Sequence, residues 1–357
     1  MVSLIKKSYK VIGLMSGTSL DGLDITYCNF YEKNYRWDFE LLKNDTLEYP
    51  SYLLGKLKKS TSLSGLELSN LDIDLGQFIG LSCHDFIAKN KLTVDFISSH
   101  GHTVFHQPEN GLTLQIGNGS DIAALTKTPV ICDFRSNDIA NGGQGAPLVP
   151  IGDALLFSEY DSCINIGGFA NISYLQNQKS IAFDICPVNI ILNWLTQKLD
   201  LIFDKDGLIA ESGNINFPLL GKLNSIEYYS SSPPKSLGKE WSDEIILPLL
   251  NASDLSAPDL LRTYTEHCSI QISNVLNTSN IKSVLFTGGG TFNKFLMRRI
   301  ADHTHCKIVI PKPDIINYKE AIIFGFLGLL RWEGKINCLR SVTGARRDNI
   351  GGAVYLP

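Results

Sequence analysis

The same order of strand and turn signals occurs twice along the 357-residue sequence. In residues 9–17, YKVIGLMSG is typical of a buried strand that ends in a glycine turn, and alternating runs at 23–31 and 35–44 follow it as a hairpin or meander. Residues 161–185 repeat this order as strand, glycine turn, strand, polar turn and strand. Because each half then passes to helices and further strands, the sequence predicts a duplicated α/β architecture with a cleft between two lobes.

Apolar residues at helical spacing predict helices over residues 64–90, 188–199 and 317–332, the last of them mostly buried. Residues 281–303 are typical of a strand, a glycine loop and a helix. The Ser/Pro-rich run at 228–238 predicts a surface segment.

Composition narrows the class of protein. A net charge of -4 gives no reason to expect nucleic acid or an acidic membrane surface as partner. No apolar run reaches the roughly 18 residues of a membrane helix, and no signal peptide is apparent at the start of the sequence. The eight cysteines contain no CxxC pair, which indicates reduced thiols. We therefore expect a cytoplasmic protein of two domains that acts on a small molecule.

The run GLMSGTSLDGLD is the first candidate for a binding loop. Gly17, Thr18 and Ser19 follow a predicted strand, and their backbone N–H groups and hydroxyls suit a phosphate. Asp21 and Asp24 suit a magnesium ion held through water. The run lacks the Gly-Lys-Ser/Thr ending of the Walker pattern. The alternative is a hairpin turn, in which these residue types are common.

The run LFTGGGTFNKFL is the second candidate. Gly288, Gly289 and Gly290 stand between a strand and a helix, with Asn293 expected in the first helical turn. Such a loop can lie flat against a nucleotide, and the start of the helix favours anions. The alternative is a tight strand-to-helix connection that needs positive φ.

Two further runs carry polar groups near predicted strand ends. The long loop at 133–150 is costly to order and favours a functional role, with Arg135 suited to a carboxylate; the alternative is an interdomain linker. In SSHGHTVFHQ, the pair His100 and His102, with Asp133, suits zinc and would make a metallohydrolase. The alternative is a set of histidines that hydrogen-bond beside a polar ligand.

Asp184 ends an apolar run in SIAFDICPVNIIL. It suits the cap of a helix that begins near Pro187. It equally suits a functional carboxylate at the end of a strand, where α/β proteins gather their polar groups. The two interpretations are compatible.

Together these runs resemble the anhydro-N-acetylmuramic acid kinase family. They occur in family order and span nearly the whole chain: GLMSGTSLDGLD, SSHGHTVFHQ, DFRSNDIANGGQGAPLVP, NIGGFANIS and VLFTGGGTFNKFLM. The resemblance implies the two-lobed fold of the sugar kinase, Hsp70 and actin superfamily, with duplicated mixed-sheet cores and with ATP and substrate in an interdomain cleft. We expect an N-terminal lobe of residues 1–135 plus 335–357 and a C-terminal lobe of residues 136–334.

The resemblance also implies a reaction. An ATP-dependent kinase would open 1,6-anhydro-N-acetylmuramic acid with water and phosphorylate O6, giving N-acetylmuramic acid 6-phosphate and ADP in peptidoglycan recycling. Asp184 matches the general base that activates the water. ATP and Mg²⁺ are the expected cofactors, with Asp21 toward the metal. A homodimer is the assembly to test.

The resemblance assigns the remaining candidate residues to groups. The ATP phosphates would meet Gly17, Thr18, Ser19, Leu20, Asp21, Gly22 and Asp24. The nucleotide loop would be Gly288, Gly289, Gly290 and Asn293. The sugar would meet His100, Arg135, Asp138, Gln144, Asn189 and Glu320.

One departure concerns the run DICPVN. Cys186 and Val188 stand where the family carries glycine, whereas Asp184, Pro187 and Asn189 match. Side chains there would block the close approach of backbone to a phosphate or sugar. Three alternatives therefore stay open: a related kinase for another sugar or anhydrosugar, a zinc-dependent hydrolase, and a non-catalytic nucleotide or sugar sensor.

Overall fold

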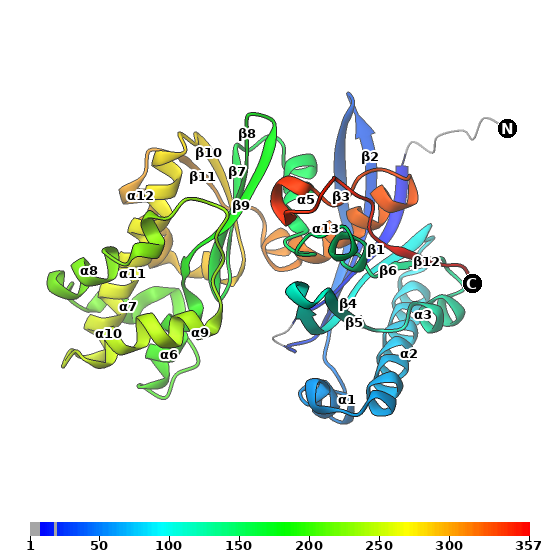
Figure 1. Cartoon of the computed structure of the whole chain (residues 1–357), viewed down its shortest axis with the longest axis horizontal. Coiled ribbons are helices and arrows are strands. Elements are labelled where there is room, and N and C mark those ends of the chain that lie inside the picture. The colour runs from blue at the N-terminus through cyan, green and yellow to red at the C-terminus, as the bar shows by residue number, and fades with distance from the viewer. Residues whose placement is uncertain (1–7, 18–19) are drawn as a thin grey trace. The chain divides into compact units, whose positions relative to one another are not determined.

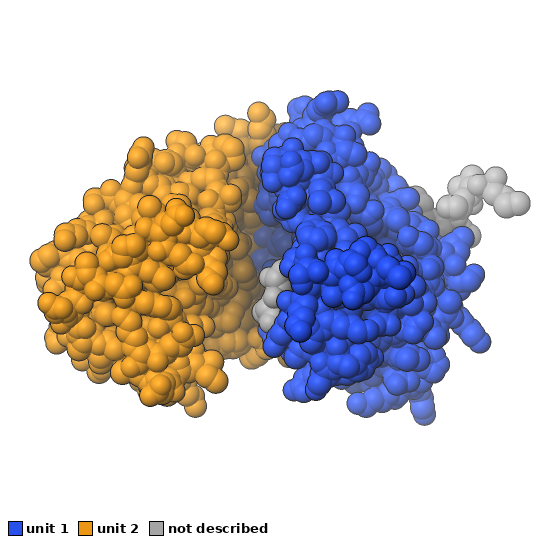
Figure 2. Space-filling view, turned by 60° about the horizontal axis from the view of Figure 1, so that its bottom comes forward, with its two compact units in different colours: residues 1–156, 318–357 blue, residues 157–317 orange. Residues whose placement is uncertain are grey.

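The computed structural model describes residues 8–17 and 20–357. The chain divides into two compact units, Met1–Leu156 with Tyr318–Pro357, and Phe157–Asn317, which Figure 2 colours blue and orange. The first unit thus also takes in residues 136–156 and 318–334, which the sequence analysis assigned to the second part. Helices of these two stretches pack on the first sheet, as described below.

The first unit is built on a seven-stranded sheet in the order β12-β6-β4-β1-β2-β3, with β5 paired to β4 (Figure 1). Its elements are β1 (Ser8–Ser16), β2 (Leu23–Lys33), β3 (Arg36–Leu47), α1 (Ser51–Leu57), α2 (Gly65–Asn90), β4 (Phe96–Gln107), β5 (Leu112–Ile116), α3 (Gly119–Thr126), β6 (Val130–Cys132), α4 (Ser136–Ala140), α5 (Val149–Leu156), α13 (Pro313–Trp332), α14 (Arg340–Thr343) and β12 (Ala353–Tyr355). The predicted meander of β1, β2 and β3 and the predicted helices are confirmed.

The two faces of this sheet bury different helices. Ile12 and Leu14 of β1 share a hydrophobic cluster with residues of α2. Successive side chains of a strand point to opposite faces, so Gly13 faces the other helix, α13. A Cβ at Gly13 would lie 2.1 Å from the carbonyl oxygen of Ala321. The absence of a side chain at Gly13 therefore lets α13 lie directly on the central strand.

The second unit is built on a five-stranded sheet in the order β11-β10-β7-β8-β9. Its elements are β7 (Ser162–Ile166), β8 (Phe169–Gln176), β9 (Lys179–Pro187), α6 (Asn189–Gln197), α7 (Leu208–Ser212), α8 (Phe217–Asn224), α9 (Lys239–Trp241), α10 (Leu247–Asn251), α11 (Ala257–Thr278), β10 (Ser283–Thr287), α12 (Lys294–His303) and β11 (Lys307–Val309). Figure 1 shows α7, α8, α10 and α11 gathered on one side of this sheet.

The two sheets share one pattern of strand pairing. In the first, β1 pairs antiparallel with β2 and parallel with β4, which pairs parallel with β6. In the second, β7 pairs antiparallel with β8 and parallel with β10, which pairs parallel with β11. Antiparallel meanders complete both sheets. The predicted α/β class with duplicated mixed-sheet cores is therefore confirmed.

In the part of the chain that the structure describes, no helix combines the length and the apolar character needed to span a bilayer.

A buried carboxylate ties α11 to α12 in the second unit. Glu266, which is 4% exposed, accepts hydrogen bonds from Arg299 Nε at 2.8 Å, from His303 Nε2 at 2.7 Å and from Arg262 Nη1 at 3.0 Å. Burial alone would raise the pKa of Glu266, but the bonds from Arg299 and His303 and the charge of Arg262 outweigh it and lower this pKa to about 2.

We expect Glu266→Ala to lower the free energy of unfolding by about 3 kcal/mol, because it leaves buried cations without their partner. The matched control is Glu211→Ala, which removes the exposed ion pair with Arg298 on the same helix and should cost at most about 1 kcal/mol. Urea denaturation at neutral pH measures both. Equal losses in the two variants would contradict the assignment.

The same pair gives a pH dependence. A folded-state pKa below the unfolded value contributes stability that is present above the unfolded pKa of about 4.3 and is lost as pH falls toward the folded pKa. The difference in stability between the parent protein and Glu266→Ala should therefore shrink between pH 5 and pH 3, as measured by thermal melting.

Candidate active site

Asp184 lies inside β9, opposite Asn171 of β8. It is half-buried, and its Oδ2 accepts a hydrogen bond of 2.9 Å from the backbone N–H of Leu237. Burial raises the pKa of the Asp184 carboxyl above its ordinary value, and the bond from Leu237 opposes this shift. A half-buried carboxylate with a raised pKa suits a general base.

The interpretation of Asp184 as a helix cap is wrong. The helix α6 begins at Asn189, and its N-cap is Val188, which makes no side-chain capping bond. The N–H of Val188 instead bonds to the carbonyl oxygen of Gly168 at 2.7 Å, and the N–H of Asn189 bonds to that of Gly167 at 3.3 Å. The turn between β7 and β8 therefore occupies the first amides of α6, and Asp184 is left for another role.

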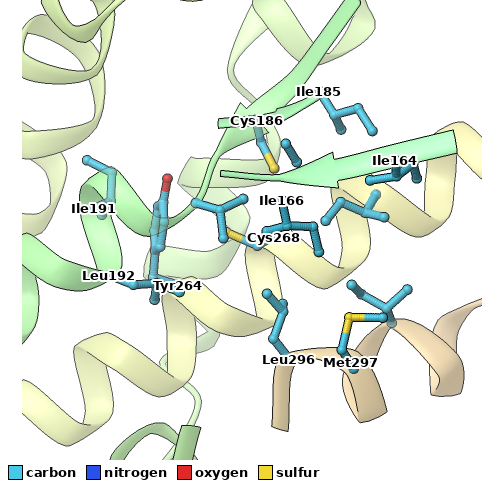
Figure 3. Packing of buried hydrophobic residues seen from close by; sticks show 14 of the residues in the cluster. Ile164, Ile166, Ile185, Cys186, Ile191, Leu192, Tyr264, Cys268, Leu296 and Met297 are labelled. Carbon is cyan, nitrogen blue, oxygen red and sulfur yellow. The ribbon is translucent and has the colours of Figure 1, made fainter. Parts of the chain in front are cut away.

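Cys186 and Val188 point away from any ligand that Asp184 would meet. Both are 0% exposed and belong to the hydrophobic core of the second unit. Figure 3 shows Cys186 in this cluster near Cys268 of α11. The pairing register of β9 shifts between its Asp184 and Cys186 partners, so Ile185 is a bulge residue and the strand's alternation is reset there. The expectation that these two side chains block the approach of a ligand is therefore wrong.

The glycine run after β10 has separate jobs for its members. A Cβ at Gly288 would lie 2.5 Å from Asn165 Oδ1, and one at Gly290 would lie 2.3 Å from Ile166 Cγ2, whereas a Cβ at Gly289 would meet nothing within 4 Å. Gly288 and Gly290 are thus required by packing on the end of β7, and Gly289 faces open space.

The run does not start the following helix directly, as the sequence analysis expected. A 3₁₀ turn, Gly289–Phe292, intervenes. Asn293 is the N-cap of α12, and its Oδ1 accepts a bond of 2.9 Å from the N–H of Leu296. Asn293 therefore stabilises the helix through its side chain.

The candidate phosphate loop joins β1 to β2 in an antiparallel hairpin. Thr18 and Ser19 lie outside the described residues. Leu20 donates its N–H to the carbonyl oxygen of Gly17 at 3.2 Å, and Gly22 is buried at the end of the loop. Asp21 is exposed. The interpretation as a hairpin turn is thus right for the backbone, and it leaves the binding role open.

Asp24 is held by the neighbouring strand. Its Oδ1 accepts a bond of 2.7 Å from the hydroxyl of Thr46 on β3. Burial raises the pKa of Asp24; the Thr46 bond opposes this shift, and the charge of Asp21 adds to it. Asp24 is thus less suited than Asp21 to a metal ion.

Arg135 and His100 form one unit. The guanidinium donates to His100 Nε2 from Nε at 3.2 Å and from Nη2 at 2.9 Å, and Nη1 donates to the carbonyl oxygen of Gly145 at 2.7 Å. His100 Nδ1 bonds to the carbonyl oxygen of Gly101 at 2.8 Å. Burial, with the charge of Arg135, lowers the pKa of His100 to about 3, so its ring is neutral with the proton on Nδ1. The guanidinium carries more donors than these bonds use and can still meet a carboxylate.

The loop at 133–150 is organised by Asp138, which is 0% exposed. Its Oδ2 accepts from the N–H of Gly145 at 2.8 Å, and its Oδ1 accepts from Thr343 at 2.9 Å and from Asn349 at 2.7 Å. These bonds hold the loop to the C-terminal segment of the same unit. Asp138 thus positions the loop that carries Arg135, and its carboxylate is already fully engaged.

The other sugar candidates differ in accessibility. Gln144 is exposed, and its backbone N–H bonds to the carbonyl oxygen of Thr343 at 2.8 Å. Glu320 on α13 keeps an exposed face, yet the protein atoms crowded around its carboxyl raise its pKa, while the charges of Lys319 and Arg135 oppose that shift. Asn189 is half-buried at the start of α6. Asp184, Asn189 and the glycine run belong to the second unit, and the remaining candidates belong to the first.

The interpretation as a zinc site is not supported. Across residues 8–17 and 20–357, no group of three or more His, Cys, Asp or Glu side chains is placed to hold a metal ion. His100 Nε2 accepts from Arg135, and His102 Nδ1 lies 3.3 Å from Ser16 Oγ. The alternative, histidines that take part in a hydrogen-bonded network, is what the structure has.

The sequence analysis missed two features. One is the buried ion pair between Asp153 and Lys319, 2.7 Å apart, beside Glu320. A lysine in an otherwise apolar helix was the available signal. The other is the contact of residues 228–238 with Asp184. Backbone atoms carry most of it, so no side-chain pattern could have found it.

We expect Cys186→Gly to lower the free energy of unfolding by about 2 kcal/mol, because it opens a void in the core and frees the backbone. The preference between sugar substrates should stay unchanged. The control is Cys306→Gly at a half-buried position outside the core cluster, which should cost less. Urea denaturation and a substrate panel measure the two effects. A changed substrate preference at parental stability would contradict the core assignment.

Comparisons with known proteins agree with the arrangement of these runs. The sequence profile described as "Anhydro-N-acetylmuramic acid kinase" matches residues 9–357. A protein of that name from Francisella tularensis subsp. novicida (strain U112) is 33% identical over 96% of this chain and 97% of its own. Another from Shewanella baltica (strain OS155 / ATCC BAA-1091) is 36% identical over 98% of this chain and 99% of its own.

A solved structure, a ROK family glucokinase from Streptomyces griseus in complex with glucose and AMPPNP, aligns with 89% of this chain and 98% of its own at 11% identity and a TM-score of 0.42, too distant to bear on the fold. The profile and the relatives cover nearly the whole chain. The chain therefore belongs to the anhydro-N-acetylmuramic acid kinase family, a family of sugar kinases, and is a phosphotransferase with an alcohol group as acceptor.

Proposed function

We propose that this kinase opens 1,6-anhydro-N-acetylmuramic acid with water and transfers the γ-phosphoryl group of ATP to O6. The products are N-acetylmuramic acid 6-phosphate and ADP, and the physiological setting is peptidoglycan recycling. The observation that carries the proposal is Asp184, a half-buried carboxylate held by one backbone N–H and with a pKa raised by burial.

The base makes the hydrolytic half of the reaction work. Water is a weak nucleophile, so a positioned carboxylate that takes its proton contributes about 10²–10⁴-fold. Water oxygen bonds to C1, the C1–O6 bond breaks, and the water proton passes to Asp184. O6 then bonds to the γ-phosphorus while the bond to the β,γ-bridging oxygen breaks, and ADP leaves. The carboxyl returns its proton to solvent.

The phosphoryl half needs positioning and charge neutralisation. In our proposal, Gly289 lets the backbone approach the nucleotide, because its missing side chain faces open space. Residues 17–22 face the phosphates. Asp21 suits Mg²⁺ through water, since an exposed carboxylate is a hard oxygen donor. The metal would supply charge neutralisation of the phosphates.

The sugar half uses the Arg135–His100 unit. The free donors of Arg135 suit the lactyl carboxylate of the substrate, since a guanidinium binds a carboxylate in a fork. His100 is neutral and accepts from Arg135, so it fixes the guanidinium without adding charge. Glu320, near both Arg135 and Lys319 in charge interaction, suits a sugar hydroxyl or amide.

The rival reading as a kinase for another sugar rested on Cys186 and Val188. Both side chains are buried in the core, so they give no reason to expect a different substrate. A non-catalytic sensor would bind ATP without turnover, and the experiment below separates it from the proposed enzyme.

We expect turnover of the anhydro sugar with ATP and Mg²⁺ in ¹⁸O-labelled water to place one label at C1 of a 6-phosphosugar, as read by mass spectrometry. Asp184→Asn should lower kcat by at least about 10²-fold, the contribution of a general base, and leave ATP binding intact. The matched control is Asp254→Asn, an exposed aspartate of the same unit. A product without label at C1 sinks the proposed mechanism, and full activity of Asp184→Asn removes its base.

The glycine run offers a test of the nucleotide side. Gly289→Ala should fold like the parent, because a Cβ there meets no atom within 4 Å, but should raise the KM for ATP because the new methyl group stands in the ligand's approach. Gly290→Ala should lower the melting temperature instead, since its Cβ would lie 2.3 Å from Ile166 Cγ2. Unchanged ATP kinetics in Gly289→Ala would place the nucleotide elsewhere.

A further inference from the structure

Residues 228–238 lie along β9 at Asp184, although their Ser/Pro-rich composition predicted a surface segment. The segment follows a 3₁₀ turn, Glu227–Ser230, and leads to α9. Lys235 and Leu237 are half-buried, and Ser236 between them is exposed. This alternation is that of an extended chain with one side against the protein.

Three hydrogen bonds join the segment to Asp184. The N–H of Asp184 donates to the carbonyl oxygen of Lys235 at 3.3 Å. The N–H of Leu237 donates to Asp184 Oδ2 at 2.9 Å, and the hydroxyl of Tyr228 donates to the carbonyl oxygen of Asp184 at 2.7 Å. The backbone and one carboxylate oxygen of Asp184 are therefore held by the same stretch of chain.

The two carboxylate oxygens are not equivalent. Oδ2 accepts from Leu237, and in the described part of the chain no protein group donates to Oδ1. A bond to one oxygen fixes the rotation of the carboxylate about its last side-chain torsion, which is otherwise broad. Oδ1 is thus the oxygen presented to a ligand.

We propose that residues 235–237 form a positioning strap, which aims the Asp184 carboxylate through the Leu237 N–H so that Oδ1 takes the proton of the attacking water. This inference rests on the proposed function, in which Asp184 is the base. Leu237 is a positioning residue, since it touches the base and not the substrate.

The strap is itself anchored by Lys235. Lys235 Nζ donates to the carbonyl oxygen of Tyr228 at 2.9 Å and lies 4.6 Å from the ring centre of Tyr228 and 5.5 Å from that of Phe183. The ring of Tyr228 packs on Trp241 with centres 5.3 Å apart. These contacts close residues 228–235 on themselves, so the Leu237 N–H arrives at Asp184 from a fixed direction.

The titratable groups around Asp184 are few. They are the Tyr228 phenol, the Lys235 ammonium and, on β9 itself, the Cys186 thiol. Burial raises the pKa of Tyr228, and the charges of Asp184 and Cys186 raise it further. Burial lowers the pKa of Lys235. Because a hydrogen-bond donor favours the ionised form of a carboxyl, loss of the Leu237 N–H should move the titration of Asp184 upward.

The test replaces the N–H of Leu237 without changing its side chain. Leu237 is exchanged in the full chain for the corresponding α-hydroxy acid, which turns the amide into an ester. We expect kcat to fall roughly tenfold to a hundredfold, as for a slightly misplaced catalytic group, with the KM for ATP unchanged. The acid limb of the kcat/KM profile and the ¹³C titration of the Asp184 carboxyl should both move to higher pH.

The control is the same ester exchange at Ser232, an exposed residue outside the strap, which should behave as the parent. Leu237→Pro is the simpler variant and should resemble the Leu237 ester if its circular dichroism and melting temperature match the parent. An unmoved ¹³C titration with kcat within twofold of the Ser232 ester would overturn the strap. A moved titration that the kinetic profile does not follow would instead overturn the base role of Asp184.

Discussion

Each sheet depends on one strand that pairs on both sides in opposite senses. β1 and β7 have an antiparallel neighbour on one side and a parallel neighbour on the other. A parallel neighbour requires a crossover connection, and helices supply it. The same pairing brings the carboxyl ends of β7 and β10 together, so their glycine turns meet at one edge and Gly288 packs on Asn165. The positions of the candidate site residues follow from this constraint.

The sequence predicts best the features that repeat with a period. The buried strand β1, the meander after it and the long helix α2 follow from patterns of apolar residues. The environment of Asp184 could not be predicted, because a bulge at Ile185 resets the alternation of β9 and turns Cys186 inward. Nor could the bond from Leu237, since every residue but proline offers the same N–H.

Asp138 and Asp184 show two uses of a carboxylate. Asp138 spends both oxygens on the protein and so fixes a loop. Asp184 spends one and keeps the other. Sequence alone ranked both as candidates, since each follows a strand and precedes a helix. The count of internal donors separates a group that supports a site from one that can act in it.

The two units differ in how the chain builds them. The second unit is one continuous stretch, whereas the first is assembled from Met1–Leu156 and Tyr318–Pro357. During synthesis the second unit can therefore complete its core while the first still lacks α13 and the edge strand β12. The sheet face that receives α13, with the bare backbone of Gly13 at its centre, stays uncovered until then. This order of events makes the earlier-translated unit the later one to mature, and the stage most exposed to chaperones and to aggregation.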